Sequence, residues 1–339
     1  MRYQFLVSLL SLSAAVLPVG TAYANSASAL QDFTVQMGSR NVITSGAFTT
    51  DSHVHGTVAV GGTAMLKGNA EINSHGNGSA EALRVYGDLK LVGETKVLSG
   101  GATVVKNSKT NSKLTLNPGK PNPNQATIVN GGTLMFNGNG GTPALSSLAS
   151  ADDFFTSRDS AMQAANTELL NSGTYAPTKI DSDTIYFNAL TSGVSVFNWN
   201  INQLTSIAEV GFNFSADSFI VVNIIGNTPN STWNASFNTL GGSDYLAQHL
   251  LWNIGVATVN FTGSEILGSI LAPDSKINSH KQLNGAIYAE SLNQHGQEIH
   301  YTHPNTPPVK DVPEEPSLLV LALACMAMGA AVWVKRFVG

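Results

Sequence analysis

The middle of the chain consists of short apolar runs, rich in β-branched residues, with asparagine and glycine close on both sides. β-branched side chains favour strands, while Asn and Gly tolerate the backbone angles of tight corners, as at Asn73. The runs therefore predict short strands in a mainly β domain, which could be a sandwich, a barrel or a solenoid. The strands are expected at Gly56–Val60, Leu83–Tyr86, Leu89–Leu91, Ala126–Val129, Thr184–Phe187, Phe219–Val222 and Ala257–Val259.

A local repeat favours the solenoid among these folds. The segments Gly268–Pro273 and Gly285–Glu290 share one pattern and start 17 positions apart (285 − 268), and Gly56–Gly61 has a similar pattern. Stacked coils of a β-helix-like solenoid require such a repeat, because each coil buries its apolar side against the next.

One segment has helical rather than strand periodicity. Phe155, Met162, Ala165 and Leu169 recur at helical spacing, and Ser150 stands three positions before Asp153 as a capping residue would. The pattern predicts one amphipathic α-helix at about 151–171 that packs against the β body.

The N-terminus has the features of a secretory signal peptide. Arg2 is followed by the apolar stretch Phe5–Val19 and by a small-x-small pattern that ends at Ala24. We expect cleavage between Ala24 and Asn25, removal of residues 1–24, and export of the domain formed by residues 25–304. A buried N-terminal helix is the alternative.

The C-terminus is predicted to be a single transmembrane helix. Leu318–Val334 carries no charge and is followed at once by Lys335 and Arg336. By the positive-inside bias, the basic residues 335–339 should stop in the cytoplasm and leave the preceding domain outside, at the cell envelope or surface. A buried core helix is the alternative. Cys325, the only cysteine, lies in this tail, so the domain outside is expected to have no disulfide.

Several glycine-rich segments resemble those of the choice-of-anchor A family of bacterial surface proteins. They are His55–Ala64, the helical region from Asp153, Gly268–Pro273, Leu283–Leu292 and Gly296–His300. The resemblance covers roughly residues 30–300 and implies an extracellular β-solenoid-like adhesive domain without catalytic residues. The closing glutamate and histidine of that family map onto Glu298 and His300, with no role implied.

The region before the apolar tail resembles a PEP-CTERM sorting signal. It reads Val312-Pro313-Glu314-Glu315-Pro316, with one glutamate more than the usual motif. The resemblance implies sorting at the membrane and processing by an exosortase-type enzyme, which would release the protein or attach it elsewhere. Residues 305–317 are predicted to form a proline-rich linker that carries this motif.

No catalytic or nucleotide-binding motif occurs, so neither an enzyme nor a cofactor is expected. Candidate metal ligands are His53 and His55, which would share one face of a strand, and the pair Asp181 and Asp183, which could hold calcium. Solvated side chains and ordinary turn chemistry are the alternatives. His295, His300 and His303 also gather near the end of the domain. The net charge of −5 offers no surface for nucleic acid.

Three functional classes remain open. A surface adhesin or extracellular-matrix component would bind a polysaccharide or matrix ligand through an extended face. A polysaccharide-active β-helix enzyme would need clustered carboxylates. An ice-binding solenoid would repeat Thr-x-Thr on successive coils, whereas Thr57, Thr115, Thr133 and Thr258 are isolated in the sequence.

Overall fold

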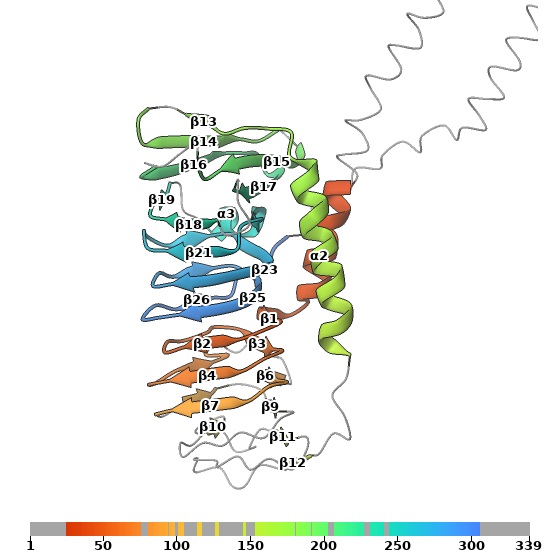
Figure 1. Cartoon of the computed structure of the whole chain (residues 1–339), viewed down its shortest axis with the longest axis vertical. Coiled ribbons are helices and arrows are strands. Elements are labelled where there is room, and N and C mark those ends of the chain that lie inside the picture. Colours follow the sequence, from red (N-terminus) through yellow and green to blue (C-terminus); the bar gives the residue numbers. More distant parts are fainter. Residues whose placement is uncertain are drawn as a thin grey trace, which may run out of the picture. The chain divides into compact units, whose positions relative to one another are not determined.

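The computed structural model is a solenoid of parallel strands flanked by helices (Figure 1). It describes residues 25–75, 81–93, 95–98, 101–104, 114–116, 126–128, 145–146, 153–179, 181–190, 192–202, 207–226, 231–240 and 244–305. Asn25–Pro307 forms one compact unit. The predicted signal peptide, the sorting motif, the apolar tail and the basic end lie outside the described residues. Within the described part, no helix combines the length and apolar character needed to cross a bilayer.

Each coil contributes strands to three faces of the solenoid. The first face holds β1 (Arg40–Thr44), β3 (Thr57–Val60), β6 (Glu81–Val85), β9 (Gly101–Val104), β11 (Ala126–Ile128), β12 (Leu145–Ser146), β15 (Ser192–Asn200), β17 (Asp217–Ile225), β20 (Leu250–Ile254) and the N-terminal parts of β23 (Ser269–Ser279) and β25 (Ile287–Gln294). The second face holds β2 (Phe48–Thr50), β4 (Ala64–Lys67), β7 (Leu89–Val92), β18 (Thr232–Ala235), β21 (Thr258–Phe261) and the C-terminal parts of β23 and β25.

The third face is made of shorter strands, and bridges from Val54 to Ile72 and Ile299 connect its parts. Its strands are β5 (Glu71–Ile72), β8 (Thr95–Val97), β10 (Leu114–Leu116), β13 (Thr178–Lys179), β14 (Thr184–Asn188), β16 (Glu209–Asn213), β19 (Asn238–Thr239), β22 (Ile266–Leu267), β24 (Leu283–Asn284) and β26 (Ile299–His300). A short helix, α3 (Asp244–His249), precedes β20.

The coils do not stack in sequence order. On the first face β1 lies between β25 and β3, with Val42 opposite both Ile287 and Val58. The chain therefore starts in the middle of the stack, winds outward to β12, and resumes at the opposite end with β14 and β15. It then winds back until β25 meets β1 (Figure 1). We call this contact between the first and last coils the seam.

The register confirms the repeat predicted from glycine spacing. Ile270 lies opposite Ile287, and Ile266 lies opposite Leu283, so successive coils here are offset by 17 residues (287 − 270). The predicted strands are also confirmed, within a few residues at their ends, and Asn73 has the positive φ expected of a corner.

The apolar side chains of the strands fill the interior. In the coils from β15 to β20, large aromatic rings fill the interior: Trp199, Trp233, Phe237 and Trp252 lie with ring centroids 5.6–6.5 Å apart. The buried indole of Trp252 donates a hydrogen bond to the carbonyl oxygen of Leu267 at 2.8 Å. Burial of these rings, together with the strand hydrogen bonds, stabilises the fold.

The predicted helix is observed as α2 (Phe154–Ser172), which packs along the first face against β15, β17, β20 and β23. Met162, Ala165 and Leu169 are buried as predicted, whereas Phe155, the fourth residue of the predicted apolar side, is only partly buried. The predicted cap is wrong, because the helix begins after Asp153, whose side chain makes no capping hydrogen bond. Ser150 lies outside the described residues.

A ladder of asparagines, of which Asn223 and Asn253 are buried and Asn198 is partly buried, holds α2 against the strands. Asn198, Asn223 and Asn253 stand opposite one another on β15, β17 and β20. Their side chains are joined by amide hydrogen bonds of 2.9 and 2.8 Å, and Asn223 also donates to the carbonyl oxygen of Leu169. Asn166 of α2 donates to Asn253 at 2.7 Å. Buried amides are costly unless paired, and here the buried Asn223 and Asn253 each pair with a neighbouring coil and with the helix, while Asn198 donates to the carbonyl oxygen of Gly173 just after it.

The sequence interpretation missed a second helix at residues 25–37. It lies beside α2 on the same side of the stack (Figure 1). Leu30, Phe33 and Met37 are buried at helical spacing. This spacing is visible in the sequence, but only the adjacent cleavage pattern was considered there.

Candidate functional site

The second face of the solenoid carries a row of outward asparagines. Asn234, Asn260, Asn278 and Asn293 stand opposite one another on β18, β21, β23 and β25. Their strand neighbours Trp233, Val259, Ile277 and Leu292 point inward and are buried, so the amides must point outward. We call these four residues the asparagine face.

Hydrogen bonds hold part of this row in a fixed geometry. The amide nitrogen of Asn260 donates to Asn234 Oδ1 at 3.0 Å, and that of Asn278 donates to Asn260 Oδ1 at 2.9 Å. Each amide has two N–H donors and two acceptor positions, so donors and acceptors are left over for a ligand. Because neighbouring strands are about 4.8 Å apart, these groups repeat at a regular interval along the stack.

The next outward row on the same face is mixed. Thr232 stands opposite Thr258, but Lys276 and Ser291 follow on the next two coils. The threonine row is therefore two coils long. Thr57 is buried, and its hydroxyl donates to the carbonyl oxygen of Ser39.

The third face holds a compact histidine–glutamate cluster at the seam. His55 follows the Val54 bridge, while Glu298 and His300 flank Ile299, the residue opposite Val54. Glu298 Oε2 lies 3.1 Å from His55 Nε2 and 3.0 Å from His300 Nε2. His53, two residues before His55, places its Nδ1 3.1 Å from Glu298 Oε1.

Three imidazole rings from consecutive coils pack together at this point: His55 is stacked on His300 with an interplanar angle of 14° and is tilted by 35° against His75. The ring of His55 lies between those of His300 and His75, with centroid distances of 4.1 and 3.7 Å. Burial, and then the neighbouring His300 and His75, lower the pKa of His55. The neutral ring, which is the metal-binding form, is therefore favoured at neutral pH.

Glu298 remains ionised in this surrounding. Burial raises its pKa, but the hydrogen bonds with His300 and His55 outweigh that effect and leave the pKa below its ordinary value. One carboxylate and two imidazole nitrogens thus converge, and all three ligand atoms lie within 4.8 Å of one another.

The remaining candidate ligands are placed apart from this cluster. Asp181 Oδ1 accepts the backbone N–H groups of Asp183 and Thr184, which is turn chemistry. His295 contacts Asp51 on another part of the surface, and the Nε2 of His303 contacts the carbonyl oxygen of Gly38. Spacing in the sequence suggested a histidine group near the end of the domain, but only His300 of that group joins the cluster.

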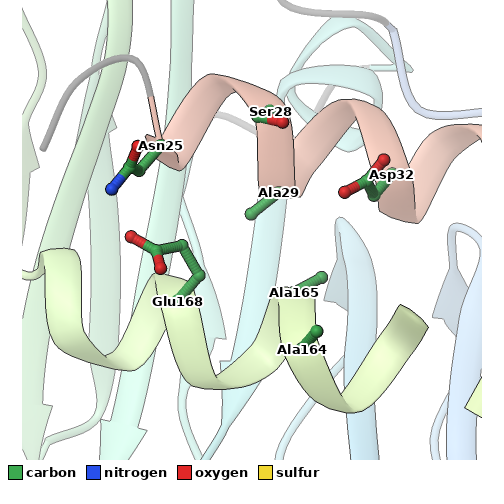
Figure 2. A pocket seen from close by; sticks show the side chains of 7 residues that line it. All are labelled: Asn25, Ser28, Ala29, Asp32, Ala164, Ala165 and Glu168. Atoms are coloured by element: carbon green, nitrogen blue, oxygen red, sulfur yellow. The ribbon is translucent and has the colours of Figure 1, made fainter. Parts of the chain in front are cut away.

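A groove of about 260 Å³ separates the helix at 25–37 from α2 (Figure 2). Small side chains, Ala29, Ala164 and Ala165, let the helices approach, and Asp32 and Glu168 lie at its rim. The groove has an open, mixed polar and apolar lining without a convergent set of ligands.

Comparison with known proteins gives a family match. The model of a family described as "Putative Ice-binding-like adhesive domain" matches residues 36–301, from before β1 to β26. No curated protein matches the sequence.

Three solved structures align with most of the chain at low identity. A glycosylated ice-binding protein from an Arctic yeast is 10% identical with a TM-score of 0.32, covering 78% of this chain and 94% of that chain. An ice-binding protein from the Antarctic ascomycete Antarctomyces psychrotrophicus is 12% identical with a TM-score of 0.32, covering 80% and 98%. An ice-binding protein domain from Shewanella frigidimarina is 10% identical with a TM-score of 0.34, covering 79% and 96%.

Proposed function

Since this chain belongs to the ice-binding-like adhesive domain family, we propose that it is a non-enzymatic adhesive protein of the cell surface whose asparagine face binds a polysaccharide. The observation that supports a polysaccharide as the ligand is the row of four outward amides in register. An extended chain of sugars offers hydroxyl groups at repeated intervals, and amides can both donate to and accept from hydroxyls.

The rigid scaffold favours binding by this face. The amides are held on strands rather than on loops, and two hydrogen bonds between them fix their orientation before a ligand arrives. Less conformational entropy is then lost on binding. Because each contact is weak, repetition over several coils supplies the affinity.

Ice binding is the second candidate, and the in-register pair Thr232 and Thr258 together with the family description favours it. The exposed Lys276 interrupts that row after two coils. The asparagine row is longer, so the geometry supports an adhesive ligand better. Ice recrystallisation measured with the purified protein separates the two candidates, since a polysaccharide adhesin should leave ice growth unchanged.

Replacing both Asn260 and Asn278 with alanine should weaken polysaccharide binding about tenfold or more. The loss of two hydrogen-bonding positions at about 1 kcal/mol each gives a change of this order. Binding would be measured on immobilised polysaccharides, including the exopolysaccharide of the producing cell. Asn188 and Asn213 form a matched exposed pair on the third face, with an amide hydrogen bond of 2.7 Å. Equal losses from the alanine double variants of the two pairs would contradict the assignment of the face.

We further propose that the chain is exported after cleavage between Ala24 and Asn25 and tethered by residues 318–334, with the motif Val312–Pro316 as a sorting signal for an exosortase-type enzyme. The charge-free stretch and the basic Lys335 and Arg336 support this part of the proposal. Deleting residues 312–339 should move the protein from the membrane fraction to the medium, as followed by immunoblot. A truncated protein that stays in the envelope would show that the tail is not the tether.

A further inference from the structure

We propose that His55, Glu298 and His300 bind one zinc ion, which joins the first and last coils of the solenoid at the seam. This site is independent of the asparagine face and lies on a different face of the molecule. Its ligands come from residues more than 240 positions apart, since 298 − 55 is 243.

Two of the three distances between the ligand atoms are close to those that zinc requires, and the third, between the two histidine nitrogens, is within 4.8 Å. Zinc bonds to histidine nitrogen and carboxylate oxygen are about 2.0–2.2 Å long, so two ligand atoms of a tetrahedral site lie about 3.3 Å apart. The two N–O distances to Glu298 Oε2 are 3.1 and 3.0 Å. Because the rings of His55 and His300 are stacked with an interplanar angle of 14°, at least one ring must turn about its side-chain bonds to direct both Nε2 lone pairs at the ion.

The type and position of the donors also fit zinc. Two imidazoles and one carboxylate are borderline ligands that suit Zn²⁺ better than Ca²⁺ or Mg²⁺, which prefer all-oxygen sites. The side chains of His300 and Glu298 are 30% and 40% exposed, so the ion could enter from solvent and keep water as a fourth ligand. His53, against the other oxygen of Glu298, would orient that carboxylate from outside.

The surrounding groups set one further requirement. His300 Nδ1 lies 3.1 Å from Gln282 Nε2. For a neutral His300 ring to bind through Nε2, its proton must sit on Nδ1, and the carboxamide of Gln282 must rotate to present its oxygen to that proton. Such a rotation exchanges two nearly isosteric groups, but it also turns the amide nitrogen away from Glu265 Oε1 and Asn284 Oδ1, to which it donates at 2.7 and 3.2 Å.

The test is zinc stoichiometry of the full-length protein. Metal-stripped protein would be equilibrated with ZnCl₂, dialysed, and analysed for bound zinc, with circular dichroism to confirm folding. We expect one zinc per chain, a rise of a few degrees in the thermal midpoint that EDTA reverses, and visible absorption characteristic of tetrahedral ligation when Co²⁺ replaces zinc. His300→Ala and Glu298→Gln should lose the stoichiometric zinc while staying folded.

The control is the second histidine–carboxylate contact, His295 with Asp51, whose Nδ1–Oδ2 distance is 3.0 Å. It offers one carboxylate and one imidazole of similar exposure, so His295→Ala should keep the full zinc content. Wild-type protein without stoichiometric zinc would overturn the proposal. So would a loss of zinc in His295→Ala equal to that in His300→Ala, because it would indicate unspecific binding to surface histidines. If the alanine variant fails to fold, His300→Gln, which keeps a polar side chain of similar reach, gives the same readout.

Discussion

Replacing Gly62 with alanine should lower the free energy of unfolding by about 3 kcal/mol or more, because no room exists for a Cβ atom at this corner. Gly46, Gly62 and Gly87 stand above one another where three consecutive coils turn from the first face to the second. Backbone hydrogen bonds link them: Gly62 N donates to Gly46 O at 2.7 Å, and Gly87 N donates to Gly62 O at 3.0 Å. A Cβ on Gly62 would lie 2.7 Å from that same oxygen of Gly46 and 2.8 Å from its carbonyl carbon.

The atoms that such a Cβ would meet belong to backbone, which cannot move aside as a flexible side chain would. The matched control is Gly296→Ala, at a corner with φ of +71° and no atom within 4 Å of the added Cβ. This control should cost about 1–2 kcal/mol through backbone conformation alone. Both values would be measured by urea unfolding followed by tryptophan fluorescence. If Gly62→Ala cost no more than the control, the coils would not be packed as closely as described.

Replacing Asn253 with alanine should cost about 3 kcal/mol and loosen α2. The Asn253 side chain is fully buried and contacts Asn223 on the next strand and Asn166 on the helix. Its removal leaves the buried Asn223 Oδ1 without this donor and takes away the acceptor of Asn166 Nδ2, which costs more than losing an exposed hydrogen bond. Urea unfolding gives the energy, and limited proteolysis reports the release of the helix.

Asn260→Ala is the comparison, because it removes a similar amide ladder contact from an exposed face. It should change stability by about 0.5 kcal/mol or less. Similar costs at the two positions would mean that the ladder under α2 does not depend on burial.

Residue pattern and spacing were enough to predict the strands and the register of successive coils, but not the order in which the coils stack. The spacing of Gly268 and Gly285 predicted a register that is observed, because that register is set by the pattern within each coil. The placement of β1 between β25 and β3 could not be predicted, because the strands of several coils have similar apolar residues and each could pair with β1. Only the three-dimensional stack shows which one meets Val42.

The histidine–glutamate cluster likewise could be predicted only in part from the sequence. The spacing of His53 and His55 predicted that both point to one face of a strand; they flank the isolated bridge at Val54 instead of lying in a strand, and both contact Glu298. That Glu298 joins them follows from the seam, and no spacing rule spans residues so far apart in the sequence. Asp181 and Asp183 have the spacing of metal ligands, but Asp181 Oδ1 accepts hydrogen bonds from the backbone N–H groups of its own turn instead.

The position of β1 at the centre of the stack has a consequence for biosynthesis. In the exported chain proposed above, the N-terminal strands emerge from the membrane first, so β1 can pair with β3 early, while its other edge awaits residues about 240 positions later (287 − 42 is 245). Throughout that interval the nascent chain presents an unpaired strand edge, which can pair with a neighbouring molecule. A chaperone outside the membrane would be needed most for this one edge, until β25 has been exported.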